Sequence, residues 1–257
     1  MKKDKLVVLF RFAVYFCGFA AGILQLLSAL TAFEAGTHYF VRGSALPVCA
    51  WVVSLLGVGF AIASAFLDKE QPVLKRSRFS PLFAAVGFAA LLPALFALLD
   101  SETKTTARLA LLALLLVILA GNFCLLSAFA KKQFAGLTAI LGLLAVLAPA
   151  CLALIYYFDK SVEMNAPVKV CLQTGLLFSM FPFLCDVRTR LNRPIPRLLT
   201  GLRLACFPIA SLSSCLLLPL LFSGRFARID YLFGGVFLFA LQLALLFDLF
   251  PSDKDHI

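Results

Sequence analysis

Eight apolar stretches, none of which contains a charged side chain, make up most of this 257-residue chain and constrain its fold more than any other feature. Only 14% of the residues are charged, against about 25% in a typical soluble domain. Most stretches reach the roughly 17 to 25 residues that a helix needs to cross the hydrocarbon core of a bilayer. They occupy residues 12–33, 43–67, 79–99, 109–130, 134–158, 170–185, 204–224 and 231–247.

The stretches predict helices, because lipid cannot satisfy the backbone amide groups of irregular structure and the alternation of barrel strands is missing. We therefore expect an all-α integral membrane protein in which residues 1–257 form a single transmembrane domain. Eight transmembrane helices are predicted at about 8–31, 45–67, 80–99, 108–130, 134–158, 167–187, 202–223 and 230–250.

The first stretch follows a basic leader, residues 1–5, and could be taken for a signal peptide. Its apolar part is longer than the roughly 7 to 15 residues of a signal-peptide core. No small-x-small cleavage site follows it before Glu34. We therefore expect residues 12–33 to be a transmembrane helix.

Basic residues gather in alternate links, which predicts the orientation in the membrane. Most of the 23 Lys and Arg residues lie at the N-terminus, in residues 68–78, 131–132 and 186–203, and in the C-terminal tail. Because cytoplasmic links retain positive charge, both termini are predicted to lie inside. The formal charge of +10 then concentrates on the cytoplasmic face. This favours anionic lipid headgroups as partners and argues against nucleic acid.

All eight cysteines lie inside or at the edge of an apolar stretch, and none forms a CxxC or Cys/His cluster. Such cysteines behave as small hydrophobic side chains, so neither a disulfide framework nor a zinc site is predicted.

A duplication of four helices is one interpretation of the second and sixth helices. Residues 45–49 (ALPVC) and 165–168 (NAPV) open the two helices, which close at Asp68 and Asp186. An even-numbered unit repeats with the same orientation, as a 4+4 repeat requires. Chance similarity between Leu- and Ala-rich stretches is the alternative.

Several prolines fall inside the predicted spans, where each removes a backbone donor and favours a kink. Bent helices either reflect ordinary irregularity or open a pocket between them. These prolines are Pro93, Pro149, Pro182, Pro208 and Pro219.

A GxxxG face on the first helix predicts close helix packing. Gly18 and Gly22 share this face with Gln25, and small residues let two helices approach closely in a membrane. The eighth helix carries Gly235 and Gln242 seven residues apart. Antiparallel packing of the two helices would place Gln25 near Gly235 and Gln242 near Gly18.

The span centres carry uncharged polar residues in place of ionisable ones: Gln25, Asn122, Gln173 and Gln242. Their expected role is hydrogen bonding between helices, and contact with a substrate in a pocket is the alternative. The spans contain neither paired carboxylates nor a histidine near a nucleophile, so no catalytic residues are predicted.

No phosphate-binding loop, zinc-protease motif or nucleophile elbow is present, so we expect no cofactor and no metal. Glu34 and His38 are four residues apart, but Gly36 interrupts them and no second histidine accompanies them. A solvated link explains these two residues better than a metal site does.

A local signature opens and closes the sixth helix: EMNAPVK at 163–169, DVR at 186–188 and RPIPR at 193–197. Asn165 is a predicted N-cap with Pro167 in the first turn. Residues 163–197 resemble a group of uncharacterised multi-pass membrane proteins of anaerobic Gram-positive bacteria. The resemblance implies a bacterial plasma membrane and no known activity.

The same signature has two interpretations. It forms either the start of a helix and a cytoplasmic anchor, or the rim of an outer site made by Glu163, Asn165 and Lys169. Lys169 is expected to extend outward to the headgroups.

The sequence thus favours a non-enzymatic plasma-membrane protein that acts through packing with a protein partner or with lipid. The alternative is a transporter, or a substrate-binding subunit, for a small neutral or apolar solute. An intramembrane carboxylate is missing from the spans, which argues against ordinary proton coupling.

Overall fold

A computed structural model describes residues 2–68, 79–101, 104–129, 135–191 and 193–248, and most of these residues are helical. Eight helices and one short hairpin follow in order. They are α1 (Lys2–Thr31), β1 (Phe33–Glu34), β2 (Tyr39–Phe40), α2 (Ala45–Leu67), α3 (Ser80–Ser101), α4 (Thr105–Phe129), α5 (Ala135–Phe158), α6 (Pro167–Arg190), α7 (Arg197–Phe222) and α8 (Ile229–Phe247).

The predicted all-α membrane bundle is confirmed. Among the described residues, seven helices are long and apolar enough to cross a membrane, and α5 contributes a shorter apolar stretch, Val146–Phe158. Two helices begin five or more residues earlier than predicted: α1 at Lys2 and α7 at Arg197. Lys2 to Arg11 continue the helix outside the apolar stretch, and Pro196 precedes α7 with its φ at −58°, close to the helical value that proline favours.

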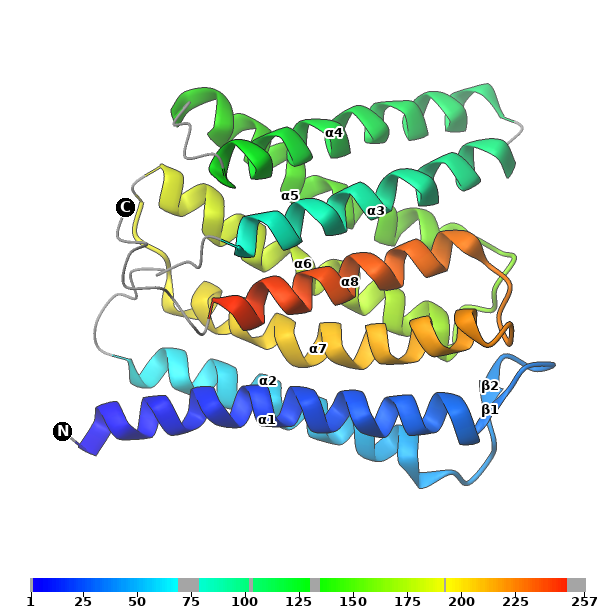
Figure 1. The fold of residues 1–257 in the computed structure, drawn as a ribbon, viewed down its shortest axis with the longest axis horizontal. Helices are drawn as coiled ribbons and strands as arrows, with labels where there is room; N and C mark the ends of the chain where they lie inside the picture. Colours follow the sequence, from blue (N-terminus) through cyan, green and yellow to red (C-terminus); the bar gives the residue numbers. More distant parts are fainter. Residues whose placement is uncertain (1, 69–78, 102–103, 130–134, 192, 249–257) are drawn as a thin grey trace.

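Helix α7 lies at the centre of the bundle, as Figure 1 shows. The antiparallel pair α1 and α2 packs on one side of α7, while α6 and α8 pack on another. Helix α3 packs against α8, and α4 packs against both α3 and α5. Helix α5 packs against α6, which in turn contacts α8. Helices α3, α4, α5, α6 and α8 therefore form a closed ring of neighbours beside α7.

Small and polar residues allow α7 to be surrounded by other helices. Ser211, Ser213 and Ser214 are buried in it. The Ser213 hydroxyl donates to the carbonyl oxygen of Cys171 in α6 at 2.8 Å, while Ser214 donates to the Gln242 amide oxygen in α8 at 3.2 Å. A helix that is buried around its circumference needs such short side chains and satisfied hydroxyl groups.

The GxxxG face of α1 packs against α7, so the predicted pairing of α1 with α8 is wrong. A Cβ atom on Gly18 would lie 2.5 Å from the Phe207 ring, and one on Gly22 would lie 2.5 Å from the Ser211 hydroxyl. Gly235 of α8 also faces α7, where Leu217 is 3.0 Å from the corresponding Cβ position. Both glycine faces fit α7 because it lies between α1 and α8.

The two ends of the bundle can be told apart by the hairpin. We call the end with β1 and β2 the hairpin end and the opposite one the terminal end, where α1 begins and α8 ends (Figure 1). Ion pairs tie helices together at the terminal end. Arg11 of α1 binds Asp68 at 2.7 Å, and Arg203 of α7 binds Asp248 beyond α8.

The contacts among described residues follow the proposed 4+4 repeat only in part. The α1–α2 contact corresponds to α5–α6, and α3–α4 corresponds to α7–α8. Within the described ranges, however, the extensive contact of α1 with α7 has no equally extensive counterpart between α5 and α3. The repeat stays a prediction. The five intrahelical prolines lie in helices that continue through them.

Candidate functional site

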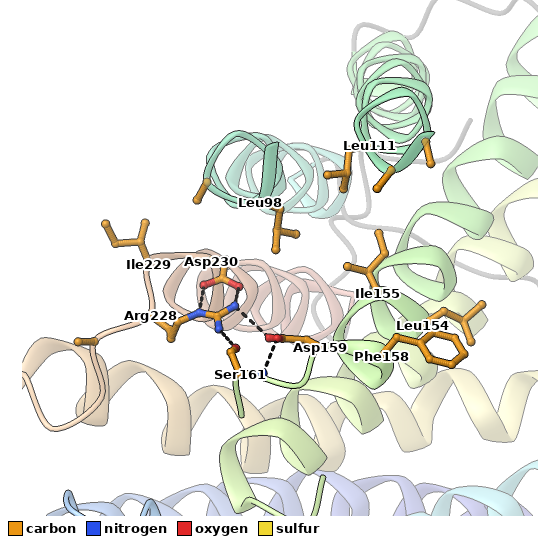
Figure 2. A pocket seen from close by; sticks show the side chains of 14 residues that line it. Leu98, Leu111, Leu154, Ile155, Phe158, Asp159, Ser161, Arg228, Ile229 and Asp230 are labelled. Atoms are coloured by element: carbon orange, nitrogen blue, oxygen red, sulfur yellow. Dashed lines mark hydrogen bonds and ion pairs between the residues drawn. The ribbon is translucent and has the colours of Figure 1, made fainter. Parts of the chain in front are cut away.

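A pocket of about 750 Å³ opens at the hairpin end between α3, α4, α5 and α8 (Figure 2). Leu98 of α3, Leu111 of α4 and Ile155 of α5 form its apolar side. Arg228 and Asp230, at the start of α8, lie on the opposite side. The pocket therefore has an apolar part and a charged wall.

Small side chains leave this space open. Ala97, Ala107 and Ala110 line the pocket from α3 and α4. Among the described residues α5 has extensive contacts with α4 and α6, but not with α3 or α8. The opening thus lies within the ring of five helices, where neighbours across the ring do not touch extensively.

The charged wall is built around the guanidinium of Arg228. Its Nε and Nη2 atoms donate to the two carboxylate oxygens of Asp230 at 2.9 and 2.7 Å. Nη2 also donates to Asp159 at 3.1 Å, and Nη1 donates to the Ser161 hydroxyl. Figure 2 shows these side chains converging from the α5–α6 loop and the start of α8. Bidentate guanidinium–carboxylate contacts fix orientation as well as charge.

Asp159 is held in its ionised form by its neighbours. Burial acts to raise the pKa of Asp159, but hydrogen bonds from Ser161 and the charge of Arg228 outweigh burial and lower it. The Ser161 amide donates to the Asp159 carboxylate at 2.9 Å. Conversely, the hydrogen bond to Asp230 raises the pKa of Arg228 despite partial burial. At neutral pH Asp159 is therefore negatively charged and Arg228 positively charged.

Lys169 supports the wall from behind and does not form an outer rim, so that prediction is wrong. Its side chain is only 1% exposed. The ammonium group donates to the carbonyl oxygens of Asp159 at 2.5 Å and Val162 at 3.1 Å. These carbonyl oxygens belong to the turn after α5, where the helix no longer supplies N–H groups to bond them. Lys169 lies in the first turn of α6, from which its ammonium group reaches the turn after α5.

Two aromatic rings complete the support of the wall. The Tyr156 hydroxyl donates to the Asp230 carbonyl oxygen at 3.3 Å. Arg228 lies over the Tyr231 ring at 5.2 Å, within the range of a cation–π contact. The two tyrosine rings meet edge to face with centroids 4.9 Å apart. These contacts join α5 to α8 below the pocket.

The hairpin covers the neighbouring loops. The Tyr39 hydroxyl donates to Glu163 at 2.7 Å, and this bond raises the pKa of Tyr39. His38 packs edge to face on Phe226, with ring centroids 5.2 Å apart. The links after α1, α5 and α7 therefore meet at the hairpin end.

The remaining predicted rim residues lie apart from the pocket wall. Glu163 and Asn165 are exposed, and Glu163 binds Tyr39. Asn165 is not the N-cap of α6: Ala166 occupies that position without a side-chain hydrogen bond, and Pro167 begins the helix. Proline at the first helical position needs no donor, so α6 starts without the amide cap.

The four polar residues predicted within the spans are distributed over separate helix contacts, and none of them lines this pocket. Gln242 binds Ser214, as described above. Asn122 faces α3, and in the amide orientation that matches donors to acceptors it donates to the Ala85 carbonyl at 2.7 Å. Gln25 is fully buried, with neither amide atom hydrogen bonded, and the Gln173 amide nitrogen is likewise buried without a partner.

The residues of the charged wall were not singled out by sequence reasoning. Asp159, Arg228 and Asp230 appear in the sequence only as charged residues of the links. One available signal was the arrangement Arg-x-Asp immediately before an apolar stretch, because Asp230 lies in the first turn of α8. Asp159 and Arg228 are about seventy residues apart in the sequence, so the sequence did not indicate that they meet.

The wall is an ion-paired group of one guanidinium and two carboxylates. Arg228 forms ion pairs with both carboxylates. The pKa of Asp159 is lowered, whereas a general acid at neutral pH requires a raised one. In the described part of the chain, no group of three or more His, Cys, Asp or Glu residues is placed to hold a metal ion. Comparisons with protein-family models, with curated proteins and with solved structures give no match.

Proposed function

We propose that this chain is a non-enzymatic integral membrane protein that binds a lipid-like molecule in the pocket at its hairpin end. The observation that carries the proposal is the combination of an apolar side formed by α3, α4 and α5 with a charged wall at the start of α8. Such a combination fits a molecule with one apolar and one polar part. The volume of about 750 Å³ lies in the ordinary range of small-molecule sites, roughly 300 to 1,000 Å³.

The surroundings of the pocket support access from the membrane. Leu154 and Phe158 of α5 line it and are 58% and 73% exposed, respectively. Ile229 of α8 also lines it and is 62% exposed. Exposed apolar side chains at the end of a membrane bundle lie against lipid. A lipid-like molecule would therefore enter sideways.

The proposed setting is a bacterial plasma membrane, with the hairpin end outside and the basic terminal end on anionic lipid headgroups. The distribution of Lys and Arg supports this orientation. A protein partner is a second way in which the bundle would act, and nothing in the arrangement of the pocket requires one.

A photoreactive alkyl probe tests the binding proposal. The purified chain in nanodiscs is labelled with the probe, and labelled peptides are mapped by mass spectrometry. We expect labels on α3, α4 and α5 near Leu98, Leu111 and Ile155, and we expect Ala107→Phe to reduce them by filling the pocket.

Ala113→Phe is the matched control, because Ala113 lies on the same helix, is exposed, and does not line the pocket. Labelling that is insensitive to Ala107→Phe, or that is equally reduced by Ala113→Phe, contradicts the proposal.

Transport of a small neutral or apolar solute is the second candidate, and the unpaired amides favour it. Gln25 is 0% exposed, and both of its amide atoms lack hydrogen-bond partners. Buried polar groups without partners are costly unless a solute or water serves them. Solute uptake into proteoliposomes that is reduced by Gln25→Leu, with unchanged folding, would support this candidate; unchanged uptake would refute it.

A further inference from the structure

We infer that the pocket takes a single-chain amphiphile whose head is a primary ammonium group. The inference rests on the proposed binding function and specifies the chemistry of the ligand. It follows from three properties of the site: the charge of the wall, its remaining hydrogen-bonding capacity, and the shape of the apolar side.

Among the side chains that line the pocket, carboxylates outnumber cations. Asp159 and Asp230 line the pocket together with one cation, Arg228. Lys169 balances the group from behind, but it does not line the pocket and is 1% exposed. A ligand therefore meets two carboxylates and one guanidinium, which attract a cationic head and repel an anionic one.

The wall also has more free acceptors than donors. Arg228 uses four of its five N–H groups in bonds to Asp230, Asp159 and Ser161. The four carboxylate oxygens accept three hydrogen bonds from Arg228 and one from the Ser161 amide, and the Ser161 hydroxyl adds one to Asp159. Because a carboxylate oxygen accepts about two hydrogen bonds, acceptor capacity is left over. A head that donates hydrogen bonds fits this wall better than a head that only accepts them.

The apolar side limits the tail. Leu98, Leu111 and Ile155 face the wall across the opening (Figure 2). The volume of about 750 Å³ is that of a site for one compact ligand. We therefore commit to one alkyl chain rather than to a whole two-chain lipid.

Four probes with the same ten-carbon chain separate these properties. Decylammonium has charge and donors, decyltrimethylammonium has charge without donors, decanol has a donor without charge, and decyl sulfate is an anion. Each competes against the photoreactive alkyl probe on wild-type protein in nanodiscs. We expect decylammonium to compete about tenfold more strongly than decanol or decyltrimethylammonium, and decyl sulfate to be weakest.

Asp159→Asn tests the source of the preference, because it removes one negative charge while keeping the size of the side chain. Asp100→Asn is the matched control, since Asp100 is an exposed carboxylate near the end of α3 that does not line the pocket. We expect the preference for decylammonium to disappear in Asp159→Asn and to persist in Asp100→Asn.

The outcomes distinguish this inference from the proposed function. Equal competition by decylammonium, decanol and decyl sulfate overturns the ammonium head but leaves the binding function intact. Stronger competition by a two-chain aminophospholipid than by decylammonium overturns the single-chain commitment. If no probe reduces labelling in the pocket, the proposed binding function fails and this inference fails with it. The ordering on wild-type protein decides these cases even where a variant does not fold.

Discussion

Replacing Lys169 with Met should destabilise the chain strongly, because this buried ammonium holds the turn after α5. It donates to two carbonyl oxygens, at 2.5 Å to Asp159 and 3.1 Å to Val162. A hydrogen bond from a charged group contributes about 1.5 to 3 kcal/mol, and a buried carbonyl left without a partner costs about 1 to 3 kcal/mol. Relief of the desolvated charge offsets part of this loss. We expect a net decrease of about 3 kcal/mol in the free energy of unfolding.

The decrease can be measured by reversible unfolding in mixed micelles of a mild detergent and dodecyl sulfate, followed by circular dichroism. Lys160→Met is the matched control, since Lys160 is exposed in the α5–α6 loop, the segment that Lys169 binds. That control should change the free energy of unfolding by less than about 0.5 kcal/mol. An amine-reactive reagent gives a second readout on wild-type protein: Lys160 should react and Lys169 should be protected. Equal stability of the two variants, or equal labelling of the two lysines, would refute the role given to Lys169.

Four further predictions follow from the contacts. Gly18→Ala should lower the free energy of unfolding by about 1 to 3 kcal/mol. Gly59→Ala should not, because nothing lies within 4 Å of its Cβ position. Equal melting temperatures of the two variants would contradict the α1–α7 contact. Gln242→Leu should destabilise the fold by about 0.6 kcal/mol. Gln25→Leu should not, because of these two residues only Gln242 has a hydrogen-bond partner. The reverse order of stabilities in the unfolding assay would contradict this. Because the folded pKa of Asp159 is lowered from 3.8, its stabilising effect is complete above that pH and is lost below it. The stability difference between wild type and Asp159→Asn should therefore shrink on acidification below pH 3.8; a difference that grows there would oppose the assignment. Reporters fused after Lys132 and Ser161 should lie inside and outside, respectively, and the opposite result would invert the orientation.

The helices were predictable from the sequence because lipid imposes a simple requirement on length and polarity. Residues 45–67 were predicted as one helix, and α2 spans Ala45–Leu67. The predicted start of α7 lies five residues too late. The charged residues Arg197 and Arg203 mark the end of the apolar stretch, but they do not interrupt the backbone hydrogen bonds of the helix. Hydropathy marks the part of a helix that lies in hydrocarbon, and the helix itself continues beyond it.

The partners of the helices and the pocket were not predictable in the same way. Gly18 and Gly22 indicated a close contact, but the sequence offered no means of choosing α7 over α8, since both carry small and polar residues. The charged wall depends on Asp159 and Arg228, which meet only through the arrangement of α5 and α8. The prediction for Lys169 was wrong because a lysine at the end of a span usually extends to the headgroups, whereas the ammonium group of Lys169 binds two carbonyl oxygens.

The central position of α7 has a consequence for biogenesis. The pair α1 and α2 joins the other helices chiefly through α7, yet the ribosome completes that pair long before α7 is synthesised. At ordinary synthesis rates the delay is on the order of ten seconds. During this time the faces around Gly18 and Gly57, which later pack on Phe207 and Pro208, have no final neighbour. The pair α1 and α2 must then be shielded by lipid or by the insertion machinery. Assembly of this bundle is therefore governed by the arrival of α7.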